Sequence, residues 1–260
     1  MRRERGDANA VIAVAGGVAV LFALVAAIGV VAMVSGSGDS EPQQAQAYIS
    51  LGDSVAAGSG ASDAARTSFA ALVAADQDGI DLYNLARPNA TTQNVIDEQI
   101  ARALPALQAD RAAFVTISAG GNDLAGLIPN ATCLEDPLPD TCPLQQALDG
   151  VRTNLRAILS YLRDANARTP IVVLAYPNFF SGTGHPFEAP AGRVLPKLNE
   201  VIEEVAGEYD RVAVARPAAA FEGEGDVLTG VLAAQFDPHP NDAGHRIIAD
   251  AMLAALREAR

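Results

Sequence analysis

The sequence predicts a three-layer α/β/α domain with a central, mostly parallel sheet of five strands, preceded by one N-terminal transmembrane helix. Three observations support this fold class. Short, almost wholly apolar runs alternate with longer amphipathic segments through residues 47–260, as in parallel sheets that helices cover on both faces. That stretch is long enough for one domain with a sizeable core but short for two. Upstream of it, residues 10–34 hold no charged or strongly polar side chain.

The apolar run Ala10–Val34 predicts the transmembrane helix. At ~1.5 Å per residue it is long enough to cross a hydrocarbon core of ~30 Å with some tilt. Three arginines precede it, so the positive-inside rule places residues 1–9 in the cytoplasm and the rest of the chain outside, on a single-pass protein of the cell membrane. A cleaved signal peptide, which would make the protein secreted, is the alternative. We favour the uncleaved anchor because the apolar part of a signal peptide usually has only ~7–15 residues.

Residues 35–46, with the sequence SGSGDSEPQQAQ, predict a flexible linker between the membrane and the domain. Because thiols oxidise outside the cytoplasm, we expect the two cysteines of the chain, Cys133 and Cys142, to form a disulfide bond. Such a bond would stabilise a short loop by roughly 2–3 kcal/mol. A metal site at the two thiolates is less favoured, because no histidine lies nearby to complete a tetrahedron.

The secondary structure of residues 47–260 follows in order from the hydrophobic pattern. We predict strands at Tyr48–Leu51, Asp81–Ala86, Phe114–Ser118, Ile171–Tyr176 and Arg211–Ala215. We predict helices at Ser68–Ala75, Gln93–Leu104, Leu144–Asn166, Ala191–Gly207 and Asn241–Arg260. In open α/β sheets the functional groups lie beyond the carboxyl ends of the strands. The residues that directly follow each strand are therefore the candidates for a site.

A serine follows the first strand, in the tripeptide Gly52-Asp53-Ser54. A serine in a tight strand-to-helix turn presents its hydroxyl at the sheet edge with its own N–H facing the same pocket, and Gly52 permits the turn. A helix cap is the structural alternative for Ser54. The same three residues recur at positions 38–40 of the linker. No strand precedes that copy, and we interpret it as chance.

Polar loops also follow the second and third strands. Pro88 and Asn89 suit the two central positions of a type II turn, which can point an N–H into the cleft. An ordinary loop in which Thr91 or Thr92 caps the next helix fits these residues equally well. After the third strand, two glycines let the backbone approach closely, and Asn122 offers an amide donor. A simple polar turn is the alternative there.

Each of the three histidines of the chain has its own setting. His239 lies between two prolines just before the last helix, which Asn241 is expected to cap. A rigid imidazole at the domain edge suits a general base near neutral pH. His245 falls inside that helix and is interpreted as a packing or surface residue. His185 lies in a loop rich in Gly and Pro, where solvation is favoured over a place at the substrate entrance.

Together, these motifs resemble those of the SGNH (GDSL) hydrolases. In chain order they are GDS after the first strand, a turn after the second, GGND after the third and DPHPN before the last helix. The resemblance covers Tyr48 to the C-terminus and implies a flavodoxin-like catalytic domain over residues 47–260. It implies the nucleophile Ser54, the base His239, and an oxyanion hole made by the N–H groups of Ser54 and Asn89 and the amide of Asn122. It implies neither a cofactor nor a metal.

Two positions depart from the pattern of that family. Asn89 stands where the family has a glycine, but the required donor is a backbone N–H, and Asn tolerates positive φ better than most residues. The family's acid lies three residues before the histidine, where this chain has Phe236. The nearest acid is Asp237, two residues before. Either Asp237 reaches the imidazole, or a backbone carbonyl orients the ring and the site is a Ser–His dyad.

We therefore expect a membrane-anchored, extracytoplasmic serine hydrolase that cleaves small-molecule, lipid or glycan esters through an acyl-enzyme. The alternatives are an O-acyl or acetyl esterase or acyltransferase that acts on glycans, and a non-catalytic ligand-binding module with the same fold. A formal charge of −13 argues against a nucleic-acid partner. The chain also lacks the G-x-S-x-G of α/β-hydrolases and the P-loop. A metal-dependent phosphoesterase is disfavoured because three histidines are too few for a two-metal cluster.

Overall fold

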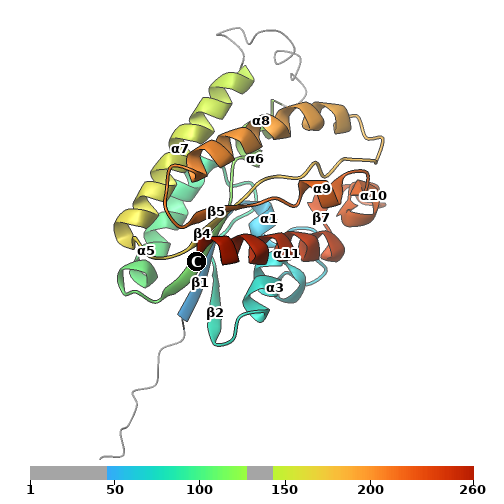
Figure 1. The fold of residues 1–260 in the computed structure, drawn as a ribbon. Helices are drawn as coiled ribbons and strands as arrows, with labels where there is room; N and C mark the ends of the chain where they lie inside the picture. The colour runs from blue at the N-terminus through green and yellow to red at the C-terminus, as the bar shows by residue number, and fades with distance from the viewer. Residues whose placement is uncertain (1–45, 128–142) are drawn as a thin grey trace, which may run out of the picture. The chain divides into compact units, whose positions relative to one another are not determined.

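The structure, a computed structural model, describes residues 46–127 and 143–260 (Figure 1). The predicted cytoplasmic segment, membrane helix and nearly all of the linker lie outside these residues, as do Cys133 and Cys142. Gln46, which we assigned to the linker, is instead the first residue of a strand. No helix within the two described ranges combines the length and the apolar character that a membrane crossing needs.

Five parallel strands form the central sheet, in the order β2-β1-β3-β4-β5. They are β1 (Gln46–Gly52), β2 (Ile80–Asn84), β3 (Ala112–Ser118), β4 (Ile171–Leu174) and β5 (Val212–Ala215). The predicted five-stranded parallel sheet is thus confirmed. Because β1 lies inside the sheet, next to β3, the carboxyl ends of the first and third predicted strands meet at one edge.

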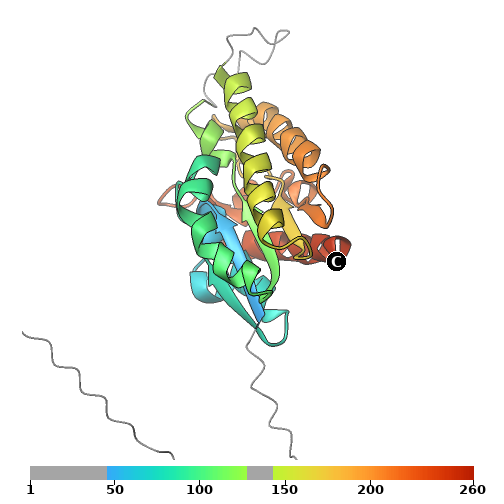
Figure 2. The ribbon, with the colours of Figure 1, turned by 90° about the vertical axis from the view of Figure 1, so that its left-hand side faces the viewer.

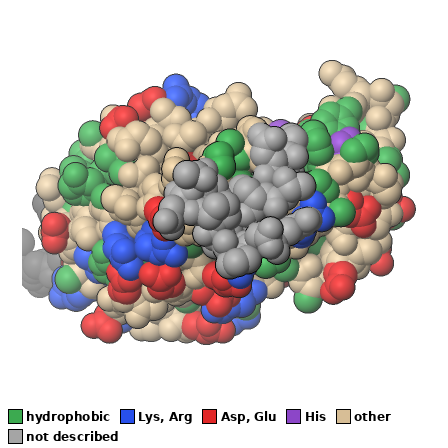
Figure 3. All heavy atoms as spheres, turned by 90° about the horizontal axis from the view of Figure 1, so that it is seen from above, with side chains coloured by type: hydrophobic (Ala, Val, Ile, Leu, Met, Phe, Trp, Pro, Cys, Tyr) green, Lys and Arg blue, Asp and Glu red, His purple; other side chains and the backbone are tan. Residues whose placement is uncertain are grey.

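Helices cover both faces of the sheet (Figures 1 and 2). One layer contains α3 (Phe69–Ala75) and α11 (Asp242–Ala259), and the other contains α5 (Ile100–Gln108), α7 (Pro143–Ala165) and α8 (Glu188–Ala206). Four of these helices were predicted with ends shifted by a few residues, whereas α5 overlaps only the last part of the predicted helix Gln93–Leu104. Figure 3 shows basic side chains directly beside acidic ones. Arg152 and Arg156 of α7, for example, pair with Glu204 of α8 at 3.2 and 3.1 Å.

Short elements complete the fold, and the sequence pattern did not predict most of them. The short helices are α1 (Ser54–Ala57), α2 (Ala64–Thr67), α4 (Thr92–Asn94), α6 (Gly121–Ala125), α9 (Ala218–Phe221) and α10 (Gly225–Leu228). The antiparallel pair β6 (Thr229–Gly230) and β7 (Asp237–Pro240) precedes α11. Such elements have too few residues to show a hydrophobic period, so only the tertiary structure reveals them.

The apolar strand runs form the core. The largest wholly buried side chains include Tyr48 and Ile49 of β1 and Phe114 of β3. The ring of Tyr48 stacks on that of Phe114 with centroids 4.4 Å apart, and its hydroxyl lies 2.7 Å from the hydroxyl of Thr116. Burying each side chain of this size contributes roughly 1.5–3 kcal/mol, and the buried hydroxyl keeps a hydrogen-bond partner.

The segment that we predicted as one helix, Gln93–Leu104, is a composite. It consists of α4, a π-helical turn η1 (Val95–Gln99) and α5, which runs on to Gln108. A π-helical turn widens the helix by one residue and therefore rotates the side chains that follow it. In this chain the turn ends on Gln99, whose side chain is 2 % exposed and faces the sheet.

Candidate active site

The turn between β1 and α1 presents Ser54 at the carboxyl edge of the sheet. Asp53 caps α1 by accepting the N–H of Val55 at 3.0 Å, and Ser54 is the first residue of that helix. Gly52 has a φ of 129°, and a Cβ on it would lie 2.0 Å from the carbonyl oxygen of Ser118. Only a glycine fits so close to the neighbouring strand. The predicted tight strand-to-helix turn is therefore present.

The structure brings together three of the predicted side chains that lie far apart in sequence. The Oγ of Ser54 is 2.9 Å from Nε2 of His239. On the other side of the ring, Nδ1 of His239 meets Oδ1 of Asp237 in a short contact. Asp237 also accepts the backbone N–H of His239 at 3.2 Å. The carboxylate two residues before the histidine thus reaches the imidazole.

This order of groups defines a proton arrangement. A proton on Nδ1 donates to the Asp237 carboxylate and leaves Nε2 as an acceptor for the hydroxyl of Ser54. His239 lies on β7, which pairs with β6. This pairing and the two prolines beside His239 restrict the backbone of the histidine. His239 was expected just outside the last helix, and α11 begins at Asp242 with Asn241 as its N-cap.

Glycine also allows the two ends of the domain to meet. Gly60 follows α1 and has a φ of 84°. A Cβ on Gly60 would lie 2.4 Å from the carbonyl oxygen of Pro240 and 2.9 Å from Cβ of His239. The loop after Ser54 and the strand that carries His239 therefore touch at backbone distance, and the missing side chain of Gly60 makes that distance possible.

The loop after β2 contains the predicted turn. Asn89 has a φ of 63°, in the left-handed region, and the N–H of Ala90 donates to the carbonyl of Arg87 at 3.2 Å. Thr91 and Asn94 form a capping box at the start of α4, so turn and cap, which we treated as alternatives, occur together. The amide of Asn122 donates to the carbonyl of Ala90 at 3.0 Å. This bond ties the loop after β3 to the turn that carries Asn89.

A small cavity of about 120 Å³ opens beside the serine. Ser54, Asn122 and His239 line it, together with Phe179, Phe180 and Leu195 among others. Asn89 is exposed and does not line this cavity. Predicted residues from α1, α6 and β7 thus surround one space. Asn89 is connected to this space through the bond between Ala90 and Asn122.

A buried hydrogen-bond network under the serine was not predicted. Asp53 is 2 % exposed and accepts hydrogen bonds from the hydroxyls of Tyr176 and Ser118. Burial raises the pKa of the Asp53 carboxyl, although these hydrogen bonds oppose the shift. Burial and the neighbouring Asp53 carboxylate raise the pKa of Tyr176 well above its ordinary value. Tyr176 and Ser118 end two predicted strands, which is the only sequence signal that pointed to them.

Gln99 is a second buried residue that sequence reasoning missed. Its side-chain oxygen accepts the N–H of Gly52 at 2.7 Å, and its nitrogen donates to the carbonyl of Gly52 at 2.8 Å. Both backbone groups of the residue that makes the turn before Ser54 are thereby satisfied by one side chain. The π-helical turn that ends on Gln99 places it there.

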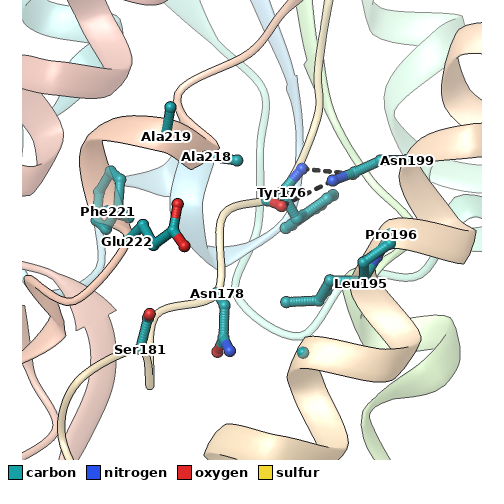
Figure 4. Close-up of a pocket in the computed structure, with 11 residues that line it drawn as sticks. Tyr176, Asn178, Ser181, Leu195, Pro196, Asn199, Ala218, Ala219, Phe221 and Glu222 are labelled. Carbon is teal, nitrogen blue, oxygen red and sulfur yellow. Dashed lines mark hydrogen bonds between the residues drawn. The ribbon is translucent and has the colours of Figure 1, made fainter.

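A larger cavity of about 440 Å³ adjoins the first one, and Tyr176 and Leu195 line both (Figure 4). Figure 4 shows Asn199 of α8 holding Tyr176 by two hydrogen bonds, at 2.8 Å to its N–H and 2.9 Å to its carbonyl. Asn178, Ser181 and Glu222 add polar groups to the wall of this cavity. Tyr176, two residues beyond the end of β4, therefore lies on the wall that the two cavities share.

The other two histidines, His245 and His185, pack against neighbouring residues. His245 is buried, accepts the N–H of Phe69 on Nδ1 at 3.2 Å, and lies 3.0 Å through Nε2 from the carbonyl of Ser59. Its burial lowers the pKa of the ring, in agreement with the packing role that we considered. His185 differs from the solvated loop residue that we favoured, because its ring stacks on Phe180 with centroids 5.1 Å apart.

A sequence model of the GDSL-like lipase/acylhydrolase family matches residues 50–247. The chain belongs to this family. It is a carboxylic ester hydrolase, and the resemblance found in the sequence motifs is confirmed. The matched span contains all of the predicted site residues, from Ser54 to His239. A search of the curated proteins gave no match.

Solved structures share the fold of this GDSL hydrolase at low sequence identity. An extracellular lipase from Streptomyces rimosus is 22 % identical with a TM-score of 0.63, and the match covers 81 % of this chain and 100 % of that one. A phospholipase A1 from Streptomyces albidoflavus NA297 is also 22 % identical, with a TM-score of 0.60 over 81 % and 99 %. An acetylxylan esterase from Geobacillus stearothermophilus is 21 % identical, with a TM-score of 0.55 over 81 % and 94 %.

Proposed function

We propose that this GDSL hydrolase cleaves carboxylic esters through an acyl-enzyme, with Ser54 as nucleophile, His239 as general base and Asp237 as the group that orients the ring. The observation that carries the proposal is the 2.9 Å contact between Oγ of Ser54 and Nε2 of His239. The carboxylate of Asp237 on the opposite ring nitrogen supports it. These are the distances and the order of groups that a serine nucleophile with its base requires.

The reaction follows from this arrangement. Nε2 of His239 takes the hydroxyl proton while Oγ of Ser54 attacks the ester carbonyl, and the imidazolium is stabilised by the Asp237 carboxylate. The tetrahedral intermediate collapses as the leaving alcohol takes that proton from Nε2. Water then repeats the sequence on the acyl-enzyme, gives its proton to Nε2, and releases the acid while Ser54 regains its hydroxyl proton.

The oxyanion hole in this proposal is formed by the N–H of Ser54 and the amide of Asn122, which both line the serine cavity. The N–H of Asn89 is the third donor, from the turn that the Ala90–Asn122 bond ties to the cavity. Asn122 gives one amide proton to the carbonyl of Ala90 and keeps a second for the oxyanion. Asn89 has a positive φ, which a glycine adopts without strain and which Asn tolerates better than most residues. Donors held before the reaction need not reorganise as charge develops, and each is typically worth ~10²–10³ in turnover.

We propose further that residues 10–34 anchor the enzyme in the membrane with the hydrolase domain on the extracytoplasmic side. The length of the apolar run and the arginines before it support this topology. Protease treatment of intact cells, followed by detection of both ends of the chain, tests it. Loss of the domain with retention of the N-terminal end supports the anchor. Recovery of an intact domain without residues 10–34 would instead show a cleaved signal peptide.

The catalytic proposal is tested by Ser54→Ala together with labelling by a serine-directed phosphonate. We expect wild-type protein to hydrolyse nitrophenyl acetate and to gain the mass of one phosphonyl group as the leaving group of the reagent departs. Ser54→Ala should lose activity by at least ~10³-fold and remain unlabelled, whereas Ser59→Ala is the matched control and should retain both properties. A wild-type protein that neither reacts with the phosphonate nor turns over esters would be a binding module. Activity that EDTA abolishes would point to a metal.

A further inference from the structure

Four aromatic rings form a cluster that the proposed reaction does not use, and we call it the aromatic rim: Phe180, His185, Phe187 and Phe236. The ring of His185 stacks on Phe180 and Phe236 with centroids 5.1 and 5.3 Å apart. Phe187 meets His185 edge-on at 5.1 Å and Phe180 at 5.8 Å. Contacts at these distances join the four rings into one continuous aromatic surface.

Half of this rim faces solvent. Phe236 is 50 % exposed and Phe187 is 39 % exposed, and both are large apolar side chains. Figure 3 shows hydrophobic side chains gathered beside a histidine at one end of the face that it presents. Single exposed apolar residues are ordinary, but a cluster of contacting aromatic rings at the surface usually marks a binding site.

The rim is continuous with the cavity at the serine. Phe180 lines that cavity together with Ser54 and His239, and the other rings extend from Phe180 toward solvent. Two separate segments supply the rings: the loop between β4 and α8, which ends on the N-cap residue Phe187, and Phe236 directly before β7. Phe236 stands at the position where the acid was expected, so shifting that acid to Asp237 also placed an aromatic ring at the mouth of the site.

We propose that the aromatic rim binds the hydrocarbon chain of the ester's acyl group. The inference rests on the proposed function, because it assigns a part of the same substrate. A cavity of about 120 Å³ is far smaller than the ~300–1,000 Å³ of common ligand sites, so an acyl chain of medium length must extend beyond it. The rim is the apolar surface that begins at the cavity wall.

The larger cavity is the competing place for the chain. It also adjoins the serine cavity through Tyr176 and Leu195, but its wall carries the polar groups of Asn178 and Ser181 and the carboxylate of Glu222. A hydrocarbon chain gains less from such a wall, because contact with it removes polar groups from water without replacing their hydrogen bonds. The rim presents three phenylalanine rings and the imidazole of His185, whose Nδ1 already accepts the N–H of Phe187 at 3.1 Å. It carries no amide or carboxylate group and is favoured for an apolar chain.

The experiment measures kcat/KM for nitrophenyl esters from acetate to octanoate below their aggregation limits. Complete burial of a methylene is worth about fourfold in binding, and one-sided cover by the rim about twofold. Octanoate has four methylenes more than butanoate, so we expect kcat/KM to rise by about 16-fold between the two esters. Phe187→Ala should lower the octanoate-to-acetate ratio by about fivefold, and Phe236→Ala by a similar amount.

Tyr161→Ala is the matched control, since Tyr161 is 48 % exposed on α7 and contributes to neither cavity. It should leave the ratio unchanged. Melting temperatures verify that all variants fold. An unchanged ratio in Phe187→Ala, or an equal loss for all esters, would overturn the proposal. Ala218→Trp, which fills the larger cavity, provides a second check. The proposal would also be overturned if Ala218→Trp lowered the octanoate-to-acetate ratio while Phe187→Ala did not.

A binding measurement separates this inference from the proposed function. Octanoate is titrated by calorimetry into Ser54→Ala and into the same variant carrying Phe187→Ala. Weaker binding by about fivefold in the double variant supports the rim even if wild-type protein hydrolyses no ester. Equal binding in both variants, with normal ester hydrolysis by the wild type, would support the proposed hydrolase function and contradict the acyl-chain site at the aromatic rim.

Discussion

At the scale of single residues, Asp237 shows how a motif can shift along a chain and still supply its group. The carboxylate stands two residues before His239, on the same short strand. It accepts hydrogen bonds from the ring Nδ1–H and from the backbone N–H of that histidine. On a strand, residues two apart point to the same face. Asp237 and His239 therefore lie side by side. The spacing in the sequence alone did not decide whether this carboxylate or a backbone carbonyl contacts the ring of His239.

We predict that Asp237→Asn lowers kcat by ~10⁴-fold with little change in KM, because the amide favours the wrong tautomer of His239. Asp226→Asn, at an exposed position of α10, is the control and should keep full activity. Steady-state kinetics with nitrophenyl acetate measure both. A loss below about tenfold in Asp237→Asn would mean that a backbone carbonyl orients the ring.

At the scale of elements, the irregular helix after β2 supports the turn that presents Ser54. The π-helical turn η1 directs Gln99 into the sheet edge, where the side chain satisfies both backbone groups of Gly52. Local widening of a helix at a functional site is a recurrent device. The helical period of Gln93–Leu104 predicted the helix but not the widening, because the pattern of apolar residues does not record one extra residue in a turn.

We predict that Gln99→Met destabilises the protein by about 2–4 kcal/mol, because an apolar side chain of similar length leaves two buried backbone groups of Gly52 without partners. Gln93→Met is the matched control: Gln93 is exposed and bonds only to Asp97 within the same helix. Its change should stay within about 0.5 kcal/mol. Urea unfolding compares the two, and equal small effects would show that Gln99 does not hold the turn.

At the scale of the whole molecule, the fold brings the first strand and the last helix of the domain together. The loop after Ser54 contacts β7 at Gly60, and His245 of α11 bridges Phe69 and Ser59. Ser62 and Thr67 are bonded to Asp242 at the start of the same helix. Several independent contacts therefore set the separation of Ser54 and His239. In the proposed mechanism, activity then depends on the packing of both ends of the domain.

We predict that Gly60→Ala lowers kcat/KM by at least about tenfold, because its Cβ would push the backbone of Pro240 and the side chain of His239 away from Ser54. Gly79→Ala is the matched control. Gly79 has a similar positive φ of 70°, but a Cβ there would meet nothing within 4 Å. Comparable losses in both variants would assign the effect to backbone strain and not to the approach of the two segments.

We predict that stability declines at alkaline pH. Burial raises the pKa of Tyr48 and of Tyr176 above the ordinary value of 10.0. The unfolded chain then loses these protons first, so the stabilisation is complete below about pH 10 and is lost as pH rises above it. Urea unfolding across this range measures the slope. Tyr48→Phe should reduce the slope of the free energy of unfolding against pH, whereas Tyr161→Phe, at an exposed position, should not. Identical slopes in the two variants would contradict the assignment of this pH dependence to the buried tyrosines.

The sequence by itself determined the sheet class, the order of the main helices and strands, and the family. It also determined three short loops that would carry a serine, an amide and a histidine, since apolar period and turn chemistry are local properties that a single chain displays. Only the tertiary structure decided that Asp237 reaches His239, that Gln99, Tyr176 and Ser118 hold the turn before Ser54, and that Phe236 joins an aromatic rim. Some of these contacts join residues that are distant in the chain, and others depend on small shifts in a turn. Neither kind of contact changes the periodic pattern of apolar residues from which the elements were predicted.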